Sequence, residues 1–86
     1  MLYAAKCYWP GVSKNDLDAR PLSSEDASYL GALLFPDDAL VLCLFQAATA
    51  TAVSQASHRE GLPCDRVMQA LWLPQVGGRN RWTSLR

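Results

Sequence analysis

Residues 29–47 decide the fold, and they read Tyr-Leu-Gly-Ala-Leu-Leu-Phe-Pro-Asp-Asp-Ala-Leu-Val-Leu-Cys-Leu-Phe-Gln-Ala. Two runs rich in apolar, β-forming side chains, 29–35 and 39–47, flank Pro36-Asp37-Asp38. Proline followed by aspartates is typical of a tight turn, so the two runs are predicted to form a β-hairpin. The second run is apolar at odd and even positions alike, as expected for a central strand covered on both faces.

The segment before this hairpin contains the signals of one helix. Ser13 is a favoured N-cap residue and Asp16 lies three positions on, so a helix is predicted to start there. Pro21 removes a backbone donor and disfavours helical geometry in the residue before it. The helix is therefore expected either to end near Ala19 or to kink and resume around residues 23–26.

Beyond the hairpin, Thr49 is predicted to cap a second helix that closes at Gly61. The chain begins with a strand-like run, residues 2–9, and a comparable run, residues 66–73, follows the second helix. In the first strand the odd positions are all apolar, whereas the even positions include a lysine and a tyrosine. The odd face of that strand should therefore meet the core.

The order strand, helix, hairpin, helix, strand predicts the fold class. It is the order of the β-α-β-β-α-β ferredoxin-like sandwich, an α+β fold in which two helices cover one face of a four-stranded antiparallel sheet. The first and third strands should lie in the centre of the sheet. A chain of 86 residues is too short for two cores. Residues 1–74 are therefore expected to form a single domain and residues 75–86 a C-terminal tail.

Composition excludes several classes of protein. No apolar run approaches the roughly 20 residues needed to span a bilayer, and the N-terminus lacks the features of a signal peptide. A cytoplasmic protein with no membrane partner is expected. Eight basic and eight acidic side chains cancel. Because phosphate backbones are bound by clustered positive charge, nucleic acid is not an expected partner.

The three cysteines, Cys7, Cys43 and Cys64, are odd in number and form no C-x-x-C pair. This count argues against a disulfide framework and against a zinc knuckle. All three are expected to be reduced thiols, with Cys43 packed inertly in a strand and Cys64 the most exposed.

Three polar residues are the candidate ligand-binding residues. Lys6 and Tyr8 on the first strand and Gln46 on the third should share the helix-free face of the sheet with several leucines. An apolar floor with a few polar groups is the usual make-up of a small-ligand pocket. The same composition suits the interface of a two-fold homodimer, and both roles can coexist.

The chain resembles a small actinobacterial ferredoxin-like family whose best-known members are nickel-binding, nickel-responsive proteins. The resemblance rests on four short stretches and runs from residue 3 to about residue 73. They are Pro10-Gly11-Val12-Ser13, Tyr29-Leu30-Gly31-Ala32, Leu42-Cys43-Leu44-Phe45-Gln46-Ala47 and Gly61-Leu62-Pro63 followed by Asp65-Arg66-Val67. The resemblance implies the ferredoxin-like fold, a homodimer and nickel as the metal. His58, the only histidine, is the candidate metal ligand, although a histidine near a helix C-terminus is also explained by the helix dipole.

These observations favour a non-enzymatic binding protein, a homodimer that holds a small ligand or a transition metal such as nickel on its open sheet face. The alternative is a small cyclase or isomerase in which Tyr8 or Lys6 serves as acid or base and Gln46 orients the substrate. A third hypothesis is an interaction protein that docks through the basic tail with Trp82. No Ser-His-Asp order, phosphate-binding loop or zinc motif is present in the sequence.

Overall fold

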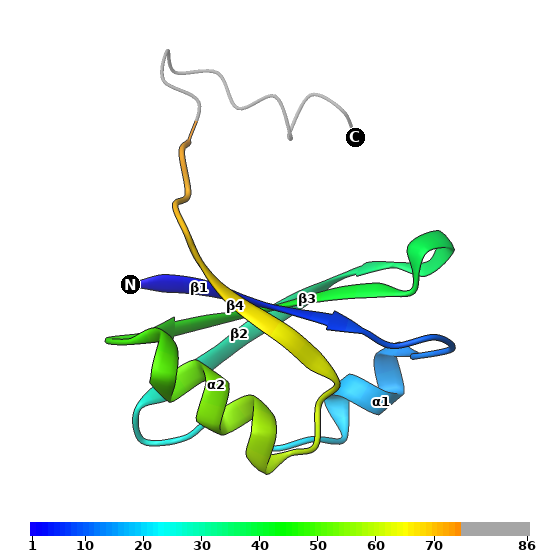
Figure 1. Ribbon diagram of the computed structural model, residues 1–86, viewed down its shortest axis with the longest axis horizontal. Helices are drawn as coiled ribbons and strands as arrows, with labels where there is room; N and C mark the ends of the chain where they lie inside the picture. The colour runs from blue at the N-terminus through cyan, green and yellow to red at the C-terminus, as the bar shows by residue number, and fades with distance from the viewer. Residues whose placement is uncertain (75–86) are drawn as a thin grey trace.

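The computed structural model describes residues 1–74. Two helices lie on one side of a four-stranded sheet (Figure 1). The elements in chain order are β1 (Leu2–Tyr8), α1 (Lys14–Asp18), β2 (Ala27–Phe35), the 3-10 turn η1 (Pro36–Asp38), β3 (Leu40–Ala47), α2 (Ala50–Arg59) and β4 (Cys64–Ala70). The strand order across the sheet is β2-β3-β1-β4 and all neighbours are antiparallel. The ferredoxin-like fold is therefore confirmed, whereas the predicted tail, residues 75–86, lies outside the described residues.

The hairpin forms as predicted, with one difference at its turn. Ala39 was expected to open the second strand, but it adopts a left-handed conformation with φ of 52° and ends η1 instead. This conformation turns the chain back, so that β3 begins at Leu40. A bulge between Tyr29 and Gly31 shifts the β2–β3 register by one residue.

Helix α1 is short because residues at both of its ends favour termination of the helix. The Ser13 backbone N–H donates to Asp16 Oδ2 at 2.8 Å, and the Asp16 N–H donates to Ser13 Oγ at 3.4 Å, which together form a capping box. The helix ends at Asp18 with Ala19 as its C-cap. Pro21 thus stops the helix and the chain does not resume it, which decides between the two alternatives.

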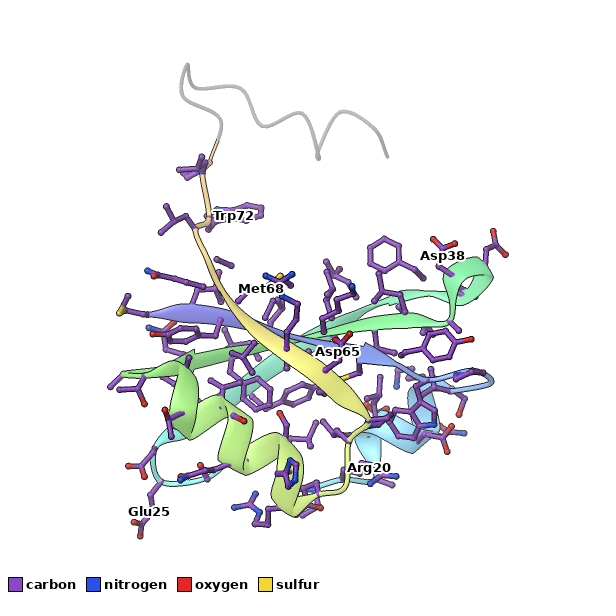
Figure 2. The ribbon with its side chains drawn as sticks, in the orientation of Figure 1. Arg20, Glu25, Asp38, Asp65, Met68 and Trp72 are labelled. Carbon is purple, nitrogen blue, oxygen red and sulfur yellow. A yellow bond between two sulfur atoms is a disulfide. The ribbon has the colours of Figure 1, made fainter. Side chains whose placement is uncertain are left out.

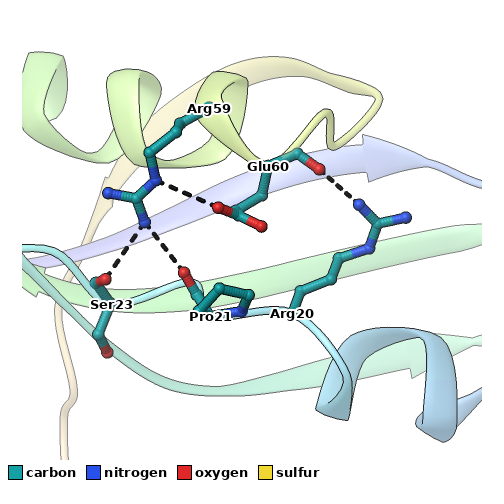
Figure 3. Close-up of polar contacts among 5 residues, drawn as sticks. All are labelled: Arg20, Pro21, Ser23, Arg59 and Glu60. Atoms are coloured by element: carbon teal, nitrogen blue, oxygen red, sulfur yellow. Dashed lines mark hydrogen bonds and ion pairs between the residues drawn. The ribbon is translucent and has the colours of Figure 1, made fainter.

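The segment after α1 is fixed to the end of α2 by two arginines (Figure 3). Arg59 donates through Nη2 to the carbonyl oxygens of Pro21, at 2.9 Å, and Ser23, at 3.2 Å. Arg20 donates to the carbonyl of Glu60. Its guanidinium also lies 4.8 Å from the ring centroid of Trp9, a cation–π contact. These contacts fix residues 20–23, which form no helix or strand, to the end of α2 and to Trp9.

The core lies between the sheet and the helices and follows the predicted alternation. The odd-numbered side chains of β1 and β3 face the helices, where Val53 of α2 and Leu22 of the α1–β2 segment pack on them. The largest fully buried side chains are Phe45, Leu22, Val41, Val53, Cys7 and Cys43. Thr49 caps α2 by accepting a hydrogen bond from the Ala52 N–H at 3.2 Å. Among residues 1–74, no helix has both the length and the apolar character needed to cross a membrane.

The expectation of three reduced thiols is wrong for two of them. Cys7 of β1 and Cys64 of β4 form a disulfide, with their Cα atoms 3.8 Å apart, and Cys43 is the free, buried cysteine. Strand β4 was predicted to begin at Arg66, but it begins at Cys64. A register shift between Lys6 and Cys7 then brings Cys64 directly opposite Cys7. Because the bridge depends on this shift, the alternation of the two strands alone does not reveal it.

Removing the disulfide should destabilise the fold. The bridge joins residues separated by 57 positions, and the chain-entropy model assigns a loop of that length about 4 kcal/mol. The double variant Cys7→Ala/Cys64→Ala should lose about 2–4 kcal/mol of unfolding free energy in urea. Dithiothreitol should lower the stability of the natural protein and of Cys43→Ala, but not that of the double variant. Equal stability of the natural protein with and without reductant would contradict the bridge.

Candidate functional site

The helix-free side of the sheet, here called the open face, is the candidate functional site. Strand registers place its members on alternate positions of all four strands. Figure 2 shows Met68 and Trp72 on this side, away from the helices. The side chains of the open face are Leu2, Ala4, Lys6, Tyr8, Ser28, Gly31, Leu33, Phe35, Leu40, Leu42, Leu44, Gln46, Arg66, Met68 and Ala70.

The open face exposes large apolar side chains to solvent. Leu33 is 51% exposed, Phe35 40% and Tyr8 64%. Leu40, Leu42 and Leu44 of the central strand β3 are half-buried between them. Large exposed apolar patches on small proteins mark sites of protein or ligand binding.

The chain beyond β4 adds to this apolar surface. Residues 71–73 were predicted to continue the last strand, but pairing ends where Ala70 meets Leu2, the first residue of β1. The preceding residue, Met1, forms its backbone hydrogen bonds with Ala47 and not with β4. The segment Leu71-Trp72-Leu73 therefore leaves the sheet, and Figure 1 shows it continuing from β4 on the side away from the helices. Its three side chains are 77%, 71% and 81% exposed.

One row of side chains crosses the open face from apolar to basic. Leu33 of β2 lies opposite Leu42 of β3, Leu42 lies opposite Lys6 of β1, and Lys6 lies opposite Arg66 of β4. Lys6 is half-buried and Arg66 is exposed. Within residues 1–74 neither side chain forms an ion pair or a side-chain hydrogen bond. Like charges directly opposite one another on neighbouring strands are destabilising, so this pair has an electrostatic cost that the described structure does not offset.

The structure brings together two of the three predicted ligand-binding residues. Lys6 and Tyr8 lie on the same face of β1 in consecutive outward positions, about 7 Å apart along the strand. Gln46 lies opposite Leu2, about 13 Å along the sheet from Lys6. Gln46 therefore does not join the other two. Arg66 is the residue that the sequence reasoning missed, although the alternation of Arg66, Met68 and Ala70 could have placed it on the open face.

His58 lies elsewhere, in a hollow of about 320 Å³ between α2 and β4. Asp65, Ser54 and Ser57 also line this hollow. Within residues 1–74, no group of three or more histidine, cysteine, aspartate or glutamate side chains could hold a metal ion. One imidazole with one nearby carboxylate is too small a ligand set for a tight nickel site within one chain, so the described residues do not fit a resident nickel ion.

Cys43 is buried on the helix-facing side of β3, as predicted, and its packing makes it unreactive. Burial raises the pKa of its thiol from the ordinary value of 9.0 to about 11. Because the thiolate is the nucleophile, a thiol with this pKa is almost entirely inactive near neutral pH.

The chain matches no protein-family model and no curated protein sequence. Its fold belongs to the ferredoxin-like class. Among solved structures it is similar to SCO4226 from Streptomyces coelicolor A3(2), with a TM-score of 0.70 and 18% sequence identity over 85% of this chain and 99% of that chain. A likeness at this level of identity shows the fold alone.

Replacing Lys6 by methionine should keep the fold and stabilise it by up to about 1 kcal/mol, because the change removes the repulsion from Arg66 and keeps the length of the stem. The gain, measured by urea unfolding at fixed protein concentration, should shrink at high salt. Lys14→Met is the matched control: Lys14 pairs with Asp18 at 2.6 Å on the exposed surface of α1. Its stability should change by less than about 0.5 kcal/mol. A Lys6→Met variant that does not fold would mean that the two faces of β1 are assigned the wrong way round.

The Cys43 thiol should resist alkylation by iodoacetamide in the native protein at pH 8 and react stoichiometrically after unfolding in urea. Because its pKa is raised in the folded state, its contribution to stability should be complete below about pH 9 and should decline as the pH rises towards about 11. Cys43→Ala should not show this part of the decline. Rapid labelling of the folded protein would contradict the buried placement.

Proposed function

We propose that this protein is a binding protein that acts as a homodimer, with the open faces of two copies turned towards each other over a small ligand. The supporting observation is the contiguous apolar surface of the open face, which includes the exposed Leu33 and Phe35. A sheet of this kind is stable only when its apolar face is covered.

A second copy of the chain is the partner that best fits this surface. The apolar residues extend over all four strands, and in an isologous pair the same patch serves both subunits. The segment 71–73 leaves β4 on the open-face side and offers each subunit a further apolar contact for its partner (Figure 1). A domain this small buries only about 60–65% of the surface of its unfolded chain, so association adds stability that the single core lacks.

Dimerisation also provides the enclosure that a ligand needs. Hollows of about 320 and 480 Å³ lie on the helix side of the sheet, next to α2 and α1 respectively. The open face is not enclosed in one chain, and the partner subunit would supply the side chains that enclose a ligand on it. Small-molecule sites are concave and largely apolar with a few polar groups, and two facing sheets with Lys6 and Arg66 between them fit that description.

Nickel stays a prediction of the family resemblance. The described residues of one chain do not provide its ligand set, so the proposal does not depend on a metal. The enzymatic alternative loses the orienting role of Gln46, because Gln46 lies far from Lys6 and Tyr8.

Sedimentation velocity at tens of micromolar should show a dimer, and Leu33→Ser should weaken it. Burying one leucine contributes about 1.5–3 kcal/mol and each dimer contains two copies of the site, so the dissociation constant should rise about tenfold or more. Leu34→Ser is the matched control, because Leu34 lies opposite Val41 on the helix-facing side of the sheet. A strictly monomeric natural protein, or equal effects of the two variants, would refute the proposed interface.

A further inference from the structure

We infer that the ligand of the open face is an amphipathic organic anion, whose acidic head is bound by Lys6 and Arg66 and whose apolar body lies along Leu42 and Leu33. This inference deepens the proposed function and rests on it for the enclosure of the ligand. The cross-strand row itself, from leucine to guanidinium, is present in each single chain.

The positive charge of the row has no ion-pair partner among residues 1–74. All eight acidic residues lie within residues 1–74, and none of them forms an ion pair with Lys6 or Arg66. Asp65 precedes Arg66 at the β1–β4 register shift, and both residues line the hollow beside α2 without forming an ion pair. Asp37 and Asp38 lie in η1 at the end of the hairpin, and Figure 2 shows Asp38 at that outer tip. An anion from outside the chain is thus the natural complement of Lys6 and Arg66.

Closing two open faces over each other increases this need. Each copy brings a Lys6 and an Arg66 that form no ion pair within residues 1–74, so the enclosed space gathers basic groups from both subunits. Burying a charge without a partner costs several kcal/mol. A bound anion offsets that cost, and this makes binding and dimerisation mutually reinforcing.

The geometry of the row indicates which anions fit. Arg66 can bind a carboxylate through two parallel hydrogen bonds, and Lys6 adds a compact charge beside it. From Lys6 the floor continues over two strand spacings, about 10 Å, to Leu33. This floor is apolar throughout. A fully hydrophilic anion would leave it uncovered, and a neutral apolar molecule would leave the basic pair without a partner.

Isothermal titration with decanoate tests the inference, with decanol and decyltrimethylammonium as probes of equal chain length, all below their micelle-forming concentrations. Decanoate should bind the natural protein at least about tenfold more tightly than either probe, because charge-assisted hydrogen bonds contribute about 1.5–3 kcal/mol. Arg66→Gln and Lys6→Met should each weaken decanoate binding by a similar factor and leave binding of decanol unchanged. Lys14→Met, which alters a lysine on α1, should bind decanoate like the natural protein.

Parallel sedimentation separates this inference from the proposed dimer. A dimer that binds all three probes equally, or binds none, would overturn the anion inference and leave the dimer standing. Decanoate binding that is unchanged in Arg66→Gln would also overturn it, and this exposed edge-strand variant should fold whether or not Lys6→Met does. A monomer that binds decanoate through Lys6 and Arg66 would support the anion inference and refute the proposed dimer. If Lys6→Met or Arg66→Gln weakens the ligand-free dimer, an acid of the partner neutralises the pair, and the inference fails.

Discussion

The antiparallel pairing of β1 with β3 is the interaction on which the rest of the structure depends. It runs from Leu2 opposite Gln46 to Tyr8 opposite Leu40 and occupies the centre of the sheet. Strand β3 is apolar on both faces, so its own pattern does not determine which face meets the helices. Polar residues on one face do, among them Lys6, because a slip by one residue would turn it into the core, where an unpaired ammonium is costly. Tyr8 and Gln46 lie on the same face and favour the same orientation.

The same charge connects the fold to the proposed binding face. Lys6 must remain on the open side, and the register then places it beside Arg66 at the basic end of an otherwise apolar row. The helices α1 and α2 cover only one side of the sheet, so the apolar residues that follow Lys6 across β3 and β2 have no cover within residues 1–74. The requirement that defines the core therefore also creates an incomplete surface, and an incomplete surface of mixed apolar and basic character is what a binding protein needs.

Much of the fold was predictable because its signals are local. The hairpin, the caps at Ser13 and Thr49, and the odd-numbered core positions of β1 each depend on residues close in sequence. Apart from the position of Ala39 in the hairpin turn, the errors arose where distant segments meet. The start of β4, the bridge between Cys7 and Cys64, and the placement of Arg66 beside Lys6 all depend on the β1–β4 register and its shift. The candidate site was half predicted for the same reason: Lys6 and Tyr8 are neighbours on one strand, whereas the position of Gln46 relative to them required the β1–β3 pairing.

The disulfide has a consequence for how the chain is connected. Cys7 and Cys64 close a covalent ring that includes α1, the hairpin and α2, whereas residues 1–6 and every residue after Cys64, including the rest of β4, lie outside it. A protease that cuts any peptide bond inside the ring, for example at the tip between β2 and β3, opens the ring without separating the molecule into two pieces. The nicked protein would keep its mass until a reductant is added. The ends of the chain, including Leu71-Trp72-Leu73, have no such protection and are lost at the first cut.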